Sequence, residues 1–166
     1  MKEAESINLD ELRRFAIQRW PEYMGRTHGI DHWDRVCKFG QILYQEGADL
    51  DVIKAFAYLH DSERLDNAED IDHGKRASKL IDTIRDTLLS GFSDGQIAKL
   101  KKACELHTVC HKTDDATINI CFDADRMDLL RIHVMPLSKR MATNQGARLV
   151  ANPDYKEWYK VHATQQ

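Results

Sequence analysis

Along most of the chain, apolar residues recur at the three- and four-residue spacing of helices that bury one face. Start and stop signals separate these helices. Asn8 followed by Glu11 has the pattern of a capping box, and Pro21 ends the helix that follows. Further helices are predicted over about 31–46, 49–60 and 73–90, a fifth opens at Ser93, and a sixth contains Asp125. The pattern therefore predicts an all-α protein of six or more helices.

Ionisable residues interrupt the apolar faces of three of these helices. His32 lies on the apolar face of its helix. His60 and Asp61 directly follow the segment 52–59, which is almost entirely apolar and is expected to be surrounded by protein. Two adjacent ionisable groups at the buried end of a helix lose their solvation together, which is costly unless a partner compensates them.

In the sixth helix, Asp125 shares the apolar face, whereas Asp123 lies two residues away and should point elsewhere. We therefore expect Asp125 to be the inward carboxylate. Taken singly, a buried His or Asp is more often a hydrogen-bonded core group than a metal ligand. One cation shared by His32, His60, Asp61 and Asp125 would satisfy all four at once.

Length and charge narrow the class of protein. The chain has 166 residues, which suits one domain with a substantial core. Its net charge is −3, and it has no long basic run. We therefore expect neither a groove that binds nucleic acid nor a surface that binds an anionic membrane. No apolar run has the length of a membrane span, and the first residues lack a signal-peptide core, so a cytoplasmic location is the expectation. The four cysteines are expected to be reduced and mostly buried.

Two segments are less clear. The β-branched alternation of residues 116–120 is compatible with a strand as well as a helix. After Pro136 the periodicity weakens, and residues 136–166 are expected to form a peripheral extension of one or two short helices, or an oligomer contact.

Three segments carry a resemblance to the HD-domain superfamily of metal-dependent phosphohydrolases. Residues 32–36 (His-Trp-Asp-Arg-Val) resemble its His-x-x-Arg-Val opening, residues 57–61 its central His-Asp doublet, and residues 124–128 its closing Ala-Asp-Arg-Leu segment. The resemblance covers about residues 25–131 and implies a single, compact HD-domain helical bundle with a central buried metal site.

The resemblance implies that His32, His60, Asp61 and Asp125 bind a divalent cation such as Mn²⁺, Mg²⁺, Fe²⁺ or another transition metal. It also implies hydrolysis of a phosphate ester or anhydride in a small substrate, usually a nucleotide. In that reaction Asp61 is a catalytic ligand, and Glu63 is a candidate for the base that positions water. Alarmone hydrolases of the superfamily have an acidic pair after the doublet, which Arg64 breaks here.

Further candidates could bind the anionic substrate or a second metal ion. Parts of the chain around residues 73–78 and 105–107 resemble small bacterial HD proteins with extra histidines. The candidates are His73, Lys75, Arg76, His107, His111 and Arg64. On a continuous helix His107 and His111 would be one turn apart. Together with Cys104 and Cys110 they could also form a small zinc site. The direction of Cys110, which would point away from the other three on one helix, argues against such a site.

Two other function classes are compatible with the same residues. The fold could be a non-catalytic, metal-containing module that senses or regulates through a nucleotide without hydrolysing it. It could also be a metal-free helical interaction protein, which chelation would not destabilise.

Overall fold

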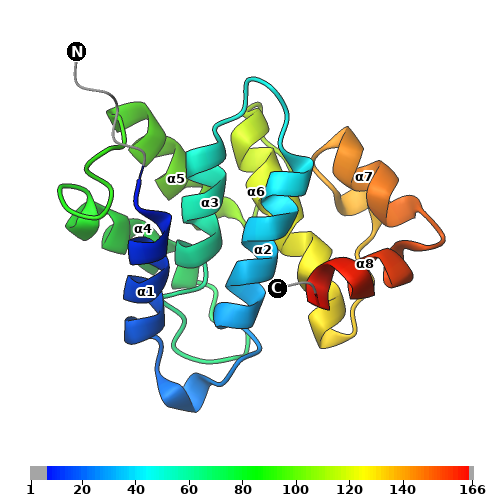
Figure 1. The fold of residues 1–166 in the computed structure, drawn as a ribbon, viewed down its shortest axis with the longest axis horizontal. Coiled ribbons are helices and arrows are strands. Elements are labelled where there is room, and N and C mark those ends of the chain that lie inside the picture. Colours follow the sequence, from blue (N-terminus) through cyan, green and yellow to red (C-terminus); the bar gives the residue numbers. More distant parts are fainter. Residues whose placement is uncertain (1–6, 165–166) are drawn as a thin grey trace.

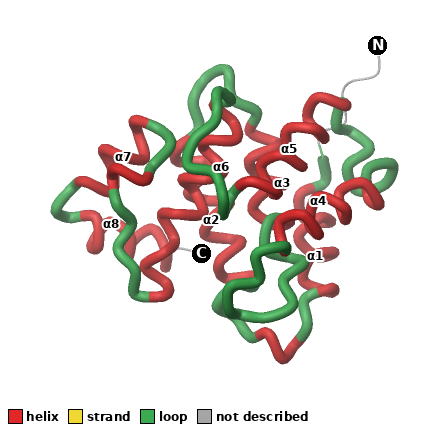
Figure 2. Tube along the Cα trace, turned by 180° about the vertical axis from the view of Figure 1, so that it is seen from behind, coloured by secondary structure: helices red, strands yellow, loops and turns green. Residues whose placement is uncertain are grey.

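A computed structural model describes residues 7–164, and within this range the chain is helical, without a strand. Figures 1 and 2 show the helices from opposite sides, joined by loops. The α-helices are α1 (Leu9–Arg19), α2 (Ile30–Leu43), α3 (Leu50–Leu59), α4 (His73–Ile84), α5 (Asp94–Leu106), α6 (Ala116–Met127), α7 (Asn144–Ala151) and α8 (Tyr155–Thr164). Three short 3₁₀ helices are η1 (Glu22–Met24), η2 (Asp128–Ile132) and η3 (Ser138–Arg140).

Helix α3 forms the centre of the bundle. Seven of its ten residues are buried, and it packs against α1, α2, α5 and α6 (Figure 1). The nearly continuous apolar sequence of this helix is what allows neighbours on all sides. His60 and Asp61 follow its last residue, so the direction of α3 delivers both side chains to the interior.

Side-chain caps set several helix starts as the sequence predicts. The Asn8 side chain accepts a hydrogen bond from the Glu11 N–H at the start of α1. Ser93 and Gln96 form a complete capping box before α5. Asp115 caps α6 by accepting from the Ile118 N–H, and residues 116–120 are helical rather than extended. Burial of residues 117–124 shows that tertiary packing outweighs the β-propensity of this segment.

Three helices are shorter than the periodicity predicts. Helix α2 ends at Leu43. After Ile84 the chain leaves α4 through turns in which the Ile84 carbonyl accepts from the Leu89 N–H, and this brings the Leu89 side chain into the core. Helix α5 ends at Leu106, so the expected helical spacing of His107 and His111 is wrong.

The C-terminal segment forms two short helices that share the core of the bundle. The Trp158 ring packs on Phe39 of α2, with ring centroids 5.7 Å apart, and Tyr155 is fully buried. The Asp123 carboxylate accepts hydrogen bonds from the Ala142 and Thr143 N–H groups, so it holds the start of α7. Residues 138–164 thus contribute the Met141, Val150 and Tyr155 side chains to the hydrophobic core.

Among residues 7–164, none of the helices combines the length and the apolar character that crossing a bilayer requires.

Candidate metal centre

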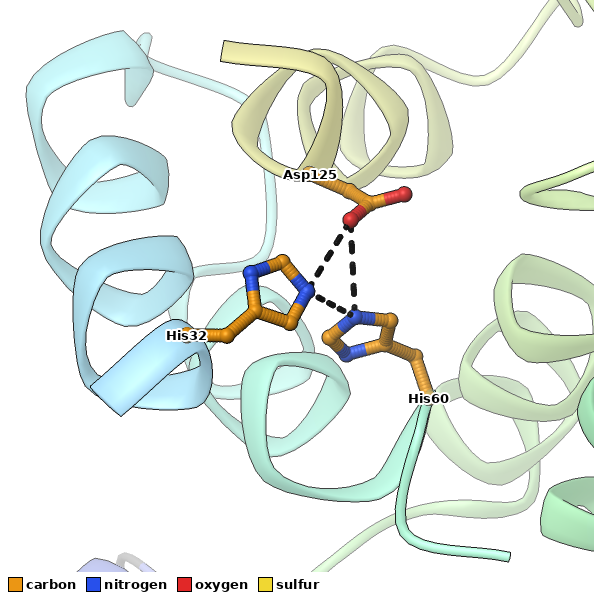
Figure 3. Close-up of side chains that lie close together, drawn as sticks. All are labelled: His32, His60 and Asp125. Carbon is orange, nitrogen blue, oxygen red and sulfur yellow. Dashed lines mark hydrogen bonds and ion pairs between the residues drawn. The ribbon is translucent and has the colours of Figure 1, made fainter. Parts of the chain in front are cut away.

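Three helices bring His32, His60 and Asp125 together in the interior. His32 lies in the first turn of α2, His60 follows α3, and Asp125 lies near the end of α6. The Nε2 atoms of His32 and His60 are 3.1 Å apart, and Oδ1 of Asp125 lies 3.2 Å from the first and 3.6 Å from the second. Figure 3 shows the three side chains pointing toward one another. Both imidazoles are fully buried, so these polar atoms meet away from bulk water.

The carboxylate of Asp61 connects this group to a second pair of histidines. Its Oδ2 atom lies 3.5 Å from Nε2 of His32 and 3.7 Å from Nε2 of His60. Its Oδ1 atom lies 3.0 Å from Nε2 of His73 and 3.6 Å from Nε2 of His107. His73 begins α4 and His107 follows α5, and these two helices pack against each other. Each oxygen of one buried carboxylate therefore faces a pair of imidazoles.

The other ring nitrogen of each histidine determines which tautomer is present. A backbone carbonyl oxygen only accepts, so a ring nitrogen bonded to one must carry the proton. Three Nδ1 atoms have such partners: His60 with Phe56 at 3.0 Å, His73 with Asp70 at 2.6 Å, and His107 with Cys104 at 2.7 Å. Nδ1 of His32 donates to the buried Asp128 carboxylate at 2.7 Å. In the neutral form of each ring, the Nε2 atom that faces the centre of the site therefore carries the lone pair.

This donor set fits a divalent cation. The Nε2 atoms of His73 and His107 are only 2.9 Å apart, and two lone pairs at that distance repel unless a cation or a proton lies between them. Imidazole nitrogens with a donor bond at Nδ1, together with ionised carboxylates, are the usual ligands of transition metal ions. His32, His60, Asp61 and Asp125 would hold one ion. Oδ1 of Asp61, together with His73 and His107, would provide ligands for a second ion.

The surroundings keep both carboxyls ionised. Burial would raise the pKa of Asp61, but the histidines around it, His60 first among them, hold its pKa well below the ordinary value. Burial is likewise outweighed at Asp125, where hydrogen bonds from His32 and His60 keep the pKa well below the ordinary value. Burial lowers the pKa of His32, but its bonds to Asp125 and Asp128 exceed that effect and the pKa is raised.

Arg64 is the predicted substrate-binding cation that contacts the site. Its Nε donates to Oδ1 of Asp61 at 3.1 Å, and its side chain is mostly buried. Arg76 instead pairs with the Asp70 carboxylate, and Lys75 is exposed and pairs with Asp72. These two cations stabilise the segment before α4, and their contacts do not support a role at the metal centre.

Two further predicted residues have partners outside the site. The Glu63 carboxylate accepts from Arg19 of α1 at 2.8 Å, which gives no support to Glu63 as the base that positions water. His111 is exposed, and its Nε2 donates to the Met141 carbonyl at 3.2 Å. Because α5 ends at Leu106, His111 leaves the face that His107 occupies.

The zinc cluster of Cys104, His107, Cys110 and His111 is not assembled. Cys104 is buried, and Cys110 Sγ bonds to the Lys112 carbonyl. Among the described residues, the groups of ligand atoms close enough for a metal ion are instead His32, His60 and Asp125, and His60, Asp61 and His107.

Sequence reasoning missed two residues that surround the site. Asp128 is fully buried and bonds to His32, and its position three residues after Asp125 on one helical face could have identified it. His28 is buried, with Nδ1 3.4 Å from Oδ2 of Asp61 and 3.2 Å from the Arg131 guanidinium. Since arginine can only donate, Nδ1 of His28 accepts, and the ring is held as the tautomer opposite to that of the four inward histidines.

Comparison with known proteins gives one informative match. No model of a known protein family matches the chain, and no curated protein matches it significantly. The crystal structure of a predicted HD superfamily hydrolase from an uncultured Thermotogales bacterium is similar, with a TM-score of 0.71 and 22% sequence identity. The match covers 93% of this chain and 88% of that chain. Together with the buried His and Asp cluster, it shows that this chain has the helical HD-domain fold.

Proposed function

We propose that the protein is a metal-dependent phosphohydrolase that cleaves a phosphate ester or anhydride bond in a small, nucleotide-like substrate. The observation that carries the proposal is the convergence of four imidazole Nε2 atoms, in two pairs, on the two oxygens of the buried Asp61. The structural neighbour is itself described as a predicted hydrolase. The choice of a nucleotide rests on the sequence resemblance.

The ligand chemistry favours a transition metal ion over Mg²⁺. Four of the candidate ligands, His32, His60, His73 and His107, are imidazoles, which suit Mn²⁺, Fe²⁺ and their neighbours better than Mg²⁺, an ion that prefers oxygen. When bound, such a cation supplies a Lewis acid that polarises a phosphoryl oxygen and lowers the pKa of a water molecule.

Charge balance supports occupancy by two ions when an anionic substrate binds. One divalent cation is neutralised by the two carboxylates Asp61 and Asp125 and retains little attraction for phosphate. Asp61, His73 and His107 would hold a second cation, and the centre would then carry a net positive charge. Arg64 adds a further positive charge on the Oδ1 side of Asp61.

The residues of the chain divide the remaining tasks. The four Nδ1 donor bonds aim the imidazole rings inward, and the two oxygens of Asp61 link the two pairs of histidines. Asp125 is 20% exposed in its side chain, in contrast to the buried histidines, which supports an approach of water and substrate from this edge of the site.

The proposal is tested with purified protein loaded with Mn²⁺ and a panel of nucleotides, phosphomonoesters, phosphodiesters and pyrophosphate. We expect release of phosphate or pyrophosphate from at least one class, and loss of that activity in Asp61→Ala. His111→Ala is the matched control because it removes an imidazole outside the site. Binding of a nucleotide without turnover across the panel would contradict hydrolysis and favour the sensing module, and activity retained by metal-free Asp61→Ala would contradict the site.

A further inference from the structure

We propose that Tyr159 of α8 is a positioning residue for the metal centre. It acts through Asp128 on His32, so that residues 138–164, which contribute no ligand, set the affinity of the site for its cation. The inference rests on the metal site of the proposed function and extends that site to the C-terminal helices.

The buried Asp128 carboxylate is the connection. Its Oδ2 atom accepts the Nδ1 proton of His32 at 2.7 Å. Its Oδ1 atom accepts from Nε of Arg35 at 2.7 Å and from the hydroxyl of Tyr159 at 2.6 Å. Asp128 is fully buried, so its oxygens take their hydrogen bonds from protein donors. The orientation of this carboxylate, and with it the His32 ring, therefore depends on all three donors.

Helix α8 is attached to both helices that carry the ligands His32 and Asp125. One turn before Tyr159, the Tyr155 hydroxyl donates to the Met127 carbonyl at 2.7 Å, at the end of α6. Near the other end of α8, the Lys38 ammonium of α2 donates to the His162 carbonyl at 2.6 Å. These bonds fix α8 across α2 and the end of α6, which explains how the Tyr159 hydroxyl is held precisely against Asp128.

Loss of the Tyr159 hydroxyl should therefore weaken metal binding without removing a ligand. Groups that hold the outer nitrogen of a histidine ligand typically change metal affinity by about 10- to 100-fold when they are altered. Tyr159 is one bond further away, so we expect the smaller effect of about 3- to 10-fold for Tyr159→Phe and about 10- to 100-fold for Asp128→Asn.

Tyr155→Phe provides a matched control. Like Tyr159→Phe, it removes one phenolic hydroxyl from α8. The hydrogen bond that is lost is 2.7 Å long, against 2.6 Å for Tyr159, and its acceptor is the neighbouring residue Met127. The bond that it removes ends on the Met127 backbone carbonyl, so it takes no donor from the Asp128 carboxylate. Both variants should lower the Tm of the metal-free protein by similar amounts, whereas only Tyr159→Phe should raise the Kd for Mn²⁺.

The experiment is a calorimetric titration of the full chain with Mn²⁺, together with thermal unfolding of the metal-free proteins. The inference would be supported if the Kd for Mn²⁺ is raised in Tyr159→Phe and Asp128→Asn and is unchanged in Tyr155→Phe. Equal Kd values for Tyr159→Phe, Tyr155→Phe and wild type would overturn it while leaving the proposed function intact. If the wild-type protein binds no Mn²⁺, both this inference and the proposed function are overturned. If Asp128→Asn fails to fold, the comparison of Tyr159→Phe with Tyr155→Phe still decides the inference.

Discussion

The Nε2 atoms of His73 and His107 lie 2.9 Å apart although each ring donates its Nδ1 proton to a backbone carbonyl. Two neutral rings of this tautomer cannot form a hydrogen bond with each other. A cation bound between the two nitrogens, or a proton on one of them, would remove the repulsion between the lone pairs. On the other side of Asp61, the Nε2 atoms of His32 and His60 are 3.1 Å apart, but there Nδ1 of His32 donates to the Asp128 carboxylate and not to a backbone carbonyl.

Metal removal should destabilise the protein because a cation binds the folded site and not the unfolded chain. At a free Mn²⁺ concentration of about 100 times Kd, binding adds about 2.7 kcal/mol, which raises Tm by about 5 to 11 °C in a chain of this size. Thermal unfolding with Mn²⁺ and with excess chelator measures the difference. His111→Ala should show the full shift and Asp61→Ala none, and equal Tm values with and without metal in wild type would count against the site.

Two histidines four residues apart should differ sharply. His107→Ala removes a ligand opposite Asp61 and is expected to lower the Mn²⁺ stoichiometry by one ion and to reduce hydrolysis by more than about 100-fold. His111→Ala is expected to leave both unchanged because its ring bonds to the Met141 carbonyl. Elemental analysis of both purified variants, combined with activity, checks this, and a matching loss in His111→Ala would contradict the assignment.

The carboxylates of Asp123 and Asp125 should affect different properties. Asp123→Ala removes an acceptor for two backbone N–H groups and the Thr143 hydroxyl, which should cost about 2 to 4 kcal/mol in the free energy of unfolding. Asp125→Ala should cost metal affinity instead. Urea unfolding of the metal-free proteins and Mn²⁺ titration separate the two effects, and the reverse pattern would show that the roles are exchanged.

Close packing of α4 on α5 should make Gly74 intolerant of a side chain. A Cβ atom at Gly74 would overlap the backbone carbonyl oxygen of Cys104, which cannot move without displacing His107. We expect Gly74→Ala to destabilise the protein by about 2 kcal/mol or more and to weaken metal binding. Gly95→Ala, in an open position of α5, should stabilise it by about 0.5 to 1 kcal/mol. Denaturant unfolding of both variants tests the contrast, and a neutral Gly74→Ala would show that the helices can separate.

The charge of Asp115 should contribute to stability in a pH-dependent way. Burial raises the pKa of Asp115, but the Ile118 N–H and the Lys99 ammonium outweigh burial and lower it. Because the pKa of Asp115 is lower in the folded state, its charge adds to the free energy of unfolding at pH values above the unfolded-state pKa of about 3.9. This contribution is lost as the pH falls through the folded-state pKa. Asp115→Asn keeps an N-cap and removes the charge, so it should cost less than about 1 kcal/mol at pH 7 and progressively less as the pH falls below the unfolded value. Unfolding across this range checks the sign, and a difference that grows toward low pH would contradict it.

Local patterns were sufficient to predict much of this protein. The helical class, the buried α3 and the inward direction of His32 and His60 follow from periodicity, because a helix has a fixed angle per residue. Periodicity also chose Asp125 over Asp123 as the inward carboxylate, but Asp123 is fully buried and Asp125 is 20% exposed in its side chain. The capping box at Ser93 and the stop at Pro21 follow from the hydrogen-bonding needs of helix ends.

Tertiary structure decided what periodicity could not. Periodicity treated His107 and His111 alike, and only the end of α5 at Leu106 separates them. Glu63 lies two residues after Asp61 in the chain, yet its carboxylate bonds to Arg19 of a distant helix. Asp128 reaches His32 across 96 residues, and Tyr159 reaches Asp128 from α8. Such partners depend on where separate helices pack, and the energy of that packing is a property of the whole core rather than of any local segment.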